Sequence, residues 1–133
     1  MHSSKNRLLA IAVTTLSAAA QAADDSYSTT YSTCMVGAGG VTMNMLDCMG
    51  SETERQDARL NQSYKAAMQA LTPAQQTQLR DAQRLWIKFR DADCNLIGSL
   101  TGGSIDRVNS ASCFLDMTKQ RADDLAGLTE SNL

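Results

Sequence analysis

The sequence predicts an all-α fold, a three-helix domain with an antiparallel hairpin, clamped by two disulfides. Three observations support this prediction. Apolar residues recur at steps of three and four residues in three separate stretches, which is the period of an amphipathic helix. The 133-residue chain is rich in helix-forming residues and has a single proline. Its four cysteines are an even number in a small chain whose N-terminus has the features of an export signal.

Residues 1–22 have the features of a cleaved signal peptide. Lys5 and Arg7 precede an apolar stretch, and an Ala-Gln-Ala run of the kind that signal peptidase recognises ends at Ala22. The apolar stretch has about 12 residues, whereas a membrane-spanning helix needs roughly 20. No cysteine follows directly after Ala22, so we expect no lipid or membrane anchor. The sequence therefore predicts a periplasmic or secreted protein that begins at Ala23 after Sec-type cleavage.

The charge balance narrows the classes of function. The whole chain has a net charge of −2, and removal of residues 1–22 takes away Lys5, Arg7 and the only histidine, His2. The remaining chain has 10 basic and 14 acidic residues, a net charge of −4. This balance argues against a nucleic-acid partner and favours a basic protein partner. Without histidine there is no His-based catalytic triad or His-ligated zinc, and we expect no enzyme activity, cofactor or metal.

Residues 23–41 are expected to form a flexible N-terminal arm and a glycine-rich loop, because they have no apolar period. A helical domain is predicted over residues 42–128, with a polar tail over 129–133. The first helix begins either at Thr42 or at Ser51, because Ser51 and the glutamate three residues later have the spacing of a capping box. Its apolar face is expected to contain Leu46, Met49, Thr53, Leu60, Tyr64, Ala67, Met68 and Leu71.

The second helix has a clearer start. Thr72 is the N-cap, Pro73 occupies the first helical position and Gln75 completes a capping box. Because this cap follows the first helix almost directly, we expect the two helices to form an antiparallel hairpin. Gly98 marks the end of the second helix, and a third amphipathic helix follows with Val108 as its first apolar position. The inner face of the second helix is expected to contain Leu79, Ala82, Leu85, Trp86, Phe89, Leu96 and Ile97.

The four cysteines are expected to form two disulfides, since none has the CxxC spacing of a redox or zinc motif. Four cysteines allow three pairings. We favour the pairs that are close in sequence, Cys34–Cys48 and Cys94–Cys113, because each would clamp one loop. A bridge between Cys48 and Cys94 across the hairpin is nearly as reasonable, and the sequence leaves this choice open.

Polar residues on the predicted inner faces are candidates for a buried pair. Asp57 precedes Leu60 by three residues and Tyr64 by seven, and an unpaired buried carboxylate would be costly. Arg90 on the second helix is the expected partner, since its planar guanidinium suits a carboxylate. We expect an Asp57–Arg90 or an Asn61–Arg90 contact across the hairpin, with a structural rather than a catalytic role.

Two helix motifs give the chain a family likeness. The first has the form D..LN..Y and the second the form AQR.WI.FRD..C, followed by Gly102, Gly103 and Ser104. From Cys34 to about Leu125, the chain resembles the LprI-like lysozyme-inhibitor family, which consists of small exported bacterial domains. It departs from the lipoprotein that gives the family its name in having no lipobox. The motif residues are Asp57, Leu60, Asn61, Tyr64, Gln83, Trp86, Phe89, Arg90, Asp91 and Cys94.

The resemblance implies a protein that binds and inhibits lysozyme and so protects peptidoglycan. The hairpin geometry places the two glycine-rich loops at one end of the domain, where loops can enter a partner's cleft. The alternative is an envelope scaffold, a secretion-associated module or an immunity module that binds another protein. The candidate binding residues are Gly39, Gly40, Gly102, Gly103 and Ser104, with Asp106 beside them.

Overall fold

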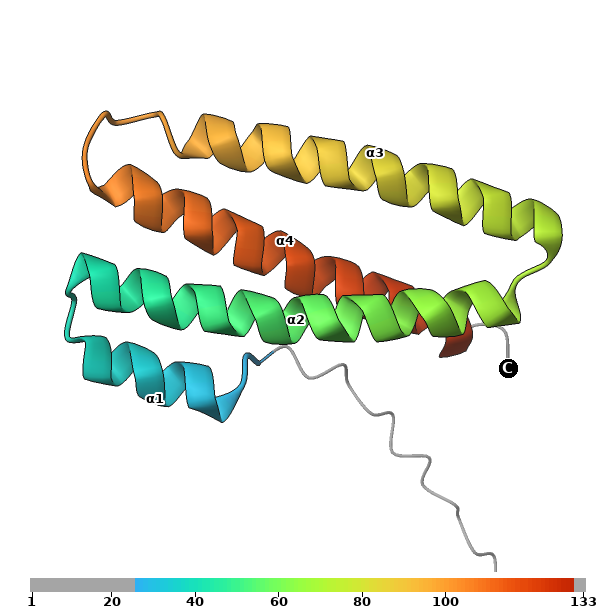
Figure 1. Cartoon of the computed structure of the whole chain (residues 1–133), viewed down its shortest axis with the longest axis horizontal. Coiled ribbons are helices and arrows are strands. Elements are labelled where there is room, and N and C mark those ends of the chain that lie inside the picture. The colour runs from blue at the N-terminus through green and yellow to red at the C-terminus, as the bar shows by residue number, and fades with distance from the viewer. Residues whose placement is uncertain (1–25, 131–133) are drawn as a thin grey trace, which may run out of the picture.

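The computed structural model describes residues 26–130, and within that range it contains four α-helices and no strand (Figure 1). The helices are α1 (Thr29–Ala38), α2 (Thr42–Ala70), α3 (Pro73–Ile97) and α4 (Ile105–Glu130). The three long helices correspond to the three predicted ones, and the all-α fold class is confirmed. The predicted signal peptide and the last three residues of the predicted tail lie outside the described range, and the first two residues of that tail belong to α4.

Helix α4 lies between α2 and α3 (Figure 1). It packs extensively along α2 and also contacts α3, whereas α1 packs against the other side of α2. The α2–α3 hairpin is antiparallel, as predicted, but its two helices come together mainly at their connection, because α4 occupies the space between them further along. Helix α4 is therefore the central element of the fold.

The hydrophobic core lies toward the closed end of the α2–α3 hairpin. Its buried members are Leu60 and Ala67 from α2, Leu79 from α3, and Ala122 and Leu125 from α4. Full burial of a leucine side chain contributes about 1.5–3 kcal/mol. Apolar burial therefore holds the three long helices together at this end. Four partly buried side chains pack against the cluster: Tyr64, Met68, Leu71 and Trp86.

The start of α3 follows the sequence prediction. The Thr72 hydroxyl accepts a hydrogen bond from the backbone N–H of Gln75 at 3.4 Å, and the Gln75 side chain accepts one from the backbone N–H of Thr72 at 3.0 Å. Pro73 occupies the first turn. This reciprocal capping box satisfies two donors that the start of a helix otherwise leaves unpaired.

The first predicted helix corresponds to α2, whose first residue decides between the two predicted starts. It starts at Thr42 and runs without interruption past Ser51, so the capping-box spacing at Ser51 marks no helix start. Cys48 and Met49, in the turns before Ser51, are buried against the rest of the fold. These tertiary contacts maintain the helix across Gly50, a residue whose conformational freedom disfavours a helix interior.

Residues 29–38 form helix α1, and the prediction of a flexible arm is wrong for these ten residues. The Ser28 side chain caps the helix by accepting a hydrogen bond from the backbone N–H of Tyr31 at 3.1 Å. Gly39 ends the helix with a left-handed backbone conformation. Ala38 is the only buried residue of α1, so this segment carries no apolar stripe from which a helix would be predicted.

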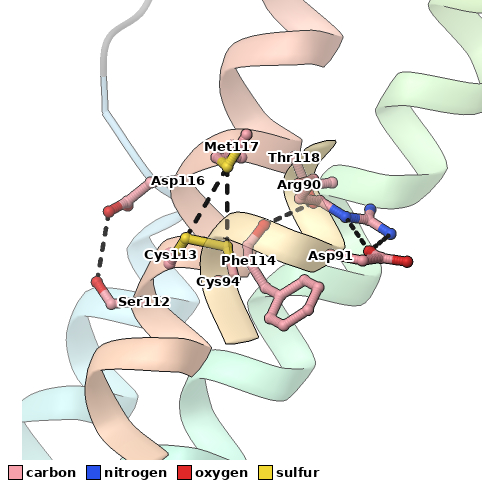
Figure 2. Close-up of a disulfide and its surroundings, with 9 residues drawn as sticks. All are labelled: Arg90, Asp91, Cys94, Ser112, Cys113, Phe114, Asp116, Met117 and Thr118. Carbon is pink, nitrogen blue, oxygen red and sulfur yellow. Dashed lines mark hydrogen bonds and ion pairs between the residues drawn. A yellow bond between two sulfur atoms is a disulfide. The ribbon is translucent and has the colours of Figure 1, made fainter. Parts of the chain in front are cut away.

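Two disulfides tie the helices in pairs. Cys34–Cys48 joins α1 to α2, and Cys94–Cys113 joins α3 to α4 (Figure 2). These are the two pairs that lie close in sequence, and the alternative bridge between Cys48 and Cys94 is not formed. Closure of a loop of this length stabilises a fold by about 3 kcal/mol in the chain-entropy description. One bridge therefore holds α1 against α2, and the other holds the last turns of α3 against α4. Neither bridge includes a residue of the core cluster.

Candidate functional site

The two glycine-rich loops lie at the same end of the molecule, opposite the closed end of the α2–α3 hairpin (Figure 1). We call this region the loop end. One loop joins α1 to α2 and the other joins α3 to α4. Gly39, Gly40 and Gly102 have positive φ angles of 57°, 78° and 75°. Other residues are strained in this conformation, so glycine determines the path of both loops.

Large apolar side chains are exposed at the loop end. Val36, Val41 and Met43 lie around the first loop, and Leu100 and Ile105 lie at the second. Val36 is 83% exposed and Leu100 is 67% exposed. Exposed apolar groups that gather in one region are typical of interaction sites, whereas scattered ones are ordinary. We call these five residues the loop-end surface.

The second loop is shaped by one carboxylate. Asp106, in the first turn of α4, accepts hydrogen bonds from the backbone N–H and hydroxyl of Thr101 and from the backbone N–H of Gly102. The Thr101 hydroxyl makes the largest contribution to lowering the pKa of Asp106, and the backbone donors lower it further against the effect of burial. We expected Asp106 to join a contact surface, but it is only 5% exposed and holds the loop from inside.

A pocket of about 410 Å³ opens beside the second loop. It is bordered by Leu46 of α2, by Gly98 at the end of α3 and by Arg107, Ser110 and Phe114 of α4. The loop-end surface therefore adjoins a concavity that combines apolar walls with polar groups. We call it the loop-end pocket.

Arg90 joins α3 to α4 beside this pocket. Its guanidinium lies over the ring of Trp86, 4.9 Å from the centroid, and over the ring of Phe114, 5.3 Å from the centroid. Two of its N–H groups donate to one carboxylate oxygen of Asp91, at 2.9 and 3.0 Å (Figure 2). A cation–π contact of this kind contributes about 0.5–2 kcal/mol, depending on its exposure. The contact with Arg90 thereby holds the Phe114 ring, which lines the loop-end pocket, against α3.

A second arginine reaches the same tryptophan from α4. The Arg121 guanidinium lies 5.9 Å from the centroid of the Trp86 ring and donates a hydrogen bond to the Gln83 side chain at 2.9 Å. Gln83, Trp86 and Arg90, which all belong to the second sequence motif, therefore contact α4. This motif serves to attach α3 to the central helix.

The predicted polar contact across the hairpin is wrong. Asp57 and Asn61 are exposed, and the Asn61 side chain donates to Asp57 at 3.3 Å within α2. Arg90 forms its ion pair with Asp91 on its own helix. The physical reason is the position of α4, which separates α2 from α3 so that their side chains do not meet at this level.

The inner face predicted for α3 is wrong in part. Leu79 is buried and Trp86 is partly buried, but Leu85, Phe89 and Leu96 are 67%, 61% and 59% exposed. Because α3 packs mainly against α4, only a narrow side of it is covered. The first motif supplies two residues to the core region, the buried Leu60 and the partly buried Tyr64.

The most enclosed polar side chain, Glu52, is not among the site residues predicted from the sequence. Glu52 is fully buried and accepts hydrogen bonds from the backbone and hydroxyl of Ser28, from Arg55 and from Gln56, at 2.6–3.1 Å. Burial alone would raise the pKa of Glu52, but these hydrogen bonds outweigh it and lower the pKa to about 2. The sequence carries a signal for this site, because Glu52 follows Cys48 by four residues and so shares its helix face.

Between residues 26 and 130, no three His, Cys, Asp or Glu side chains come together as metal ligands. No helix in the same range is long and apolar enough to cross a bilayer. The carboxylates with lowered pKa values, Glu52, Asp106 and Asp123, are engaged in contacts that connect one segment of the chain to another. The molecule presents to solvent an apolar loop end beside a pocket, and exposed apolar side chains also lie along α3.

Residues 34–125 match the family model described as lysozyme inhibitor LprI. An uncharacterized protein of Rhizobium meliloti (strain 1021) is 32% identical over 103 residues, which cover 67% of this chain and 74% of that protein. No solved structure matches the chain. The matched range includes both helix motifs and all four cysteines. The chain belongs to the LprI lysozyme-inhibitor family.

Proposed function

We propose that this protein is exported, that it binds lysozyme-type muramidases and inhibits them, and that the loop end makes the contact. One observation carries the choice of the loop end: two glycine-shaped loops bring the five exposed residues of the loop-end surface to one end of an LprI-family domain. Loops that protrude from one end of a narrow helical domain have a shape that enters a substrate cleft, and an inhibitor in the cleft protects peptidoglycan.

Rigidity supports an inhibitory role for the loop end. Asp106 holds the second loop from inside, and the Cys94–Cys113 bridge ties together the two helices that this loop connects. The Cys34–Cys48 bridge does the same for the helices around the first loop. A surface that is already fixed loses little conformational freedom on binding, so more of the contact energy appears as affinity.

The charge of the chain supports the same partner class. Without residues 1–22 the net charge is −4, which favours a basic partner protein. Opposite net charges accelerate the encounter of two proteins, whereas the apolar contacts of the loop-end surface keep the complex together. The two features therefore have complementary roles in the proposed complex.

The test compares two leucines that are equally exposed, each at 67%, in different parts of the molecule. Leu100→Ser removes an apolar group from the loop-end surface, and Leu85→Ser removes one from the exposed side of α3. We expect Leu100→Ser to raise the inhibition constant for lysozyme about tenfold, as expected for an apolar group at the centre of an interface. Leu85→Ser should leave the constant unchanged. Lysozyme turnover of cell-wall suspensions provides the measurement, and thermal unfolding checks that both variants fold.

Two results would contradict different parts of the proposal. Unchanged cell-wall turnover with wild-type protein in micromolar excess over lysozyme would show that the protein is not a lysozyme inhibitor, and an envelope scaffold, secretion-associated or immunity role would take its place. Inhibition by the wild type that Leu100→Ser and Leu85→Ser weaken equally would leave the activity intact and refute the assignment to the loop end.

A further inference from the structure

A second concavity lies on the other side of the Cys94–Cys113 disulfide from the loop-end pocket. In Figure 2, Asp116 lies on one side of this disulfide and Phe114, which lines the loop-end pocket, lies on the other. The second concavity has a volume of about 420 Å³ and is formed by α3 and α4. It shares no lining residue with the loop-end pocket. We call it the α3–α4 groove.

The charged residues of the groove are both acidic. Asp93 and Asp116 line it, and none of its lining residues is a lysine or an arginine. Asp93 forms no hydrogen bond or ion pair with the chain between residues 26 and 130. Asp116 accepts hydrogen bonds from two hydroxyl groups, one of them that of Tyr27, and these leave its negative charge uncompensated. Lys119, the nearest cation along α4, donates to Asp123 instead.

An apolar edge runs beside these carboxylates along α3. Phe89 precedes Asp93 by four residues and Leu96 follows it by three, so both are its neighbours on the helix surface. Leu85 continues the same edge by one more turn, and all three apolar side chains are exposed. Met117 lines the groove beside the disulfide, with its sulfur 3.8 and 3.9 Å from the two cysteine sulfurs. The unpaired negative charge of the groove therefore lies beside an exposed apolar edge of α3, although the three residues of that edge do not line the groove itself.

We propose that the α3–α4 groove and the apolar edge beside it together bind a cationic amphipathic helix, whose apolar side covers Phe89 and Leu96 and whose Lys or Arg side chains pair with Asp93 and Asp116. The apolar edge from Leu85 to Leu96 is about 17 Å long at 1.5 Å per residue, which matches about three turns of a partner helix. An anionic membrane surface also accepts apolar side chains, but it repels the two carboxylates. The charge thus favours a peptide helix. This site is separate from the loop end and does not depend on the proposed inhibition of lysozyme.

The test titrates two synthetic peptides of about 14 residues into the purified protein by calorimetry at low salt. One peptide has leucines on one helix face and lysines on the other, and the second has glutamate in place of every lysine. We expect the lysine peptide to bind and the glutamate peptide not to bind. Asp93→Asn and Phe89→Ser should each weaken binding of the lysine peptide about tenfold. Added salt should weaken wild-type binding more than binding to Asp93→Asn.

Two variants elsewhere on α3 are matched controls. Asp81 is an exposed carboxylate paired with Arg84, and Ile87 is an exposed apolar residue. Neither lines the groove, and neither belongs to the apolar edge formed by Leu85, Phe89 and Leu96. Asp81→Asn and Ile87→Ser should leave peptide affinity unchanged. Because all four substituted side chains are wholly or partly accessible to solvent, the unfolding midpoints should stay close to that of the wild type.

Three outcomes would overturn the proposal. The first is equal binding of the lysine and glutamate peptides. The second is an affinity for the lysine peptide that neither Asp93→Asn nor Phe89→Ser reduces relative to the controls. The third is binding to anionic vesicles that Phe89→Ser abolishes, because this result would identify a lipid surface as the partner. Lysozyme inhibition is not among these measurements, so failure here is distinct from failure of the proposed function.

Discussion

The closed end of the α2–α3 hairpin and the loop end are stabilised in different ways. At the closed end, apolar side chains of α2, α3 and α4 are buried together and a capping box begins α3. At the loop end, two disulfides and the buried carboxylate of Asp106 hold the chain, while large apolar side chains remain exposed. The difference teaches that one apolar cluster joins all three long helices at the closed end, whereas buried apolar residues elsewhere, such as Met49 and Leu115, lie outside that cluster. Covalent and polar contacts at the other end leave apolar groups available to a partner.

The strongest test of this comparison replaces one leucine at each end. Leu125 is fully buried in the core cluster, and Leu100 is exposed at the loop end. Leu125→Ala should lower the free energy of unfolding by about 4 kcal/mol, because it removes buried methyl groups and leaves a cavity. Leu100→Ala should change it by less than about 0.5 kcal/mol. Urea denaturation measures both values, and similar losses in the two variants would show that the loop end has a core of its own.

Removal of the Cys34–Cys48 bridge tests whether covalent ties replace burial around the first loop. Replacing both cysteines by serine should cost about 3 kcal/mol, the value for a loop with a sequence separation of 14 residues. Because Ala38 is the only buried residue of α1, we also expect this helix to lose amide protection before α2 does. Hydrogen exchange measures the protection of each helix. Full protection of α1 in the double variant would mean that noncovalent contacts alone hold it.

The sequence predicts the parts of the fold that depend on local patterns. The periodic apolar residues of α2 and α4 identify both helices, because each helix buries one stripe of side chains. The cap at Thr72 is equally local, since the residues that form it lie within one turn. The placement of both glycine loops at one end follows from the alternating directions of successive long helices.

The remaining features depend on which helix lies next to which. The sequence predicts a partner for Arg90 on α2, but α4 lies between α2 and α3 and Arg90 contacts Phe114 of α4 instead. The exposure of Phe89 has the same origin, because a sequence with an apolar stripe does not specify how much of that stripe a neighbour covers. Helix α1 has no apolar stripe. A disulfide and the hydrogen bond from Ser28 to Glu52 hold it in position instead.

Glu52 provides a pH-dependent test of the polar contacts outside the core cluster. Hydrogen bonds lower its pKa to about 2 from an ordinary value of 4.5. A lowered folded-state pKa contributes stability that is present above about pH 4.5 and is lost as the pH falls toward 2. The contribution at neutral pH is at most about 3 kcal/mol. Glu52→Gln should therefore be less stable than the wild type at pH 7, with a gap that narrows through this window.

Urea denaturation at several pH values measures the gap between wild type and Glu52→Gln. The pKa values of Asp106 and Asp123 are also lowered, so these carboxylates contribute to the pH dependence of both proteins. The difference between the two curves isolates Glu52. A gap that stays constant from about pH 7 to about pH 2 would show that the carboxylate charge contributes nothing and that only packing was changed.

The smallest expected effect concerns the connection at the closed end. Thr72→Ala removes the hydroxyl that caps α3 and should cost about 1 kcal/mol, the usual value for loss of an N-cap. Thr77, one turn further into α3, is a matched control because its hydroxyl bonds only to the backbone carbonyl of Pro73 within the helix. Thr77→Ala should be close to neutral, since alanine has the higher helix propensity. If the two variants lost equal stability, the cap would contribute no more than any exposed threonine. Apolar burial alone would then stabilise the closed end.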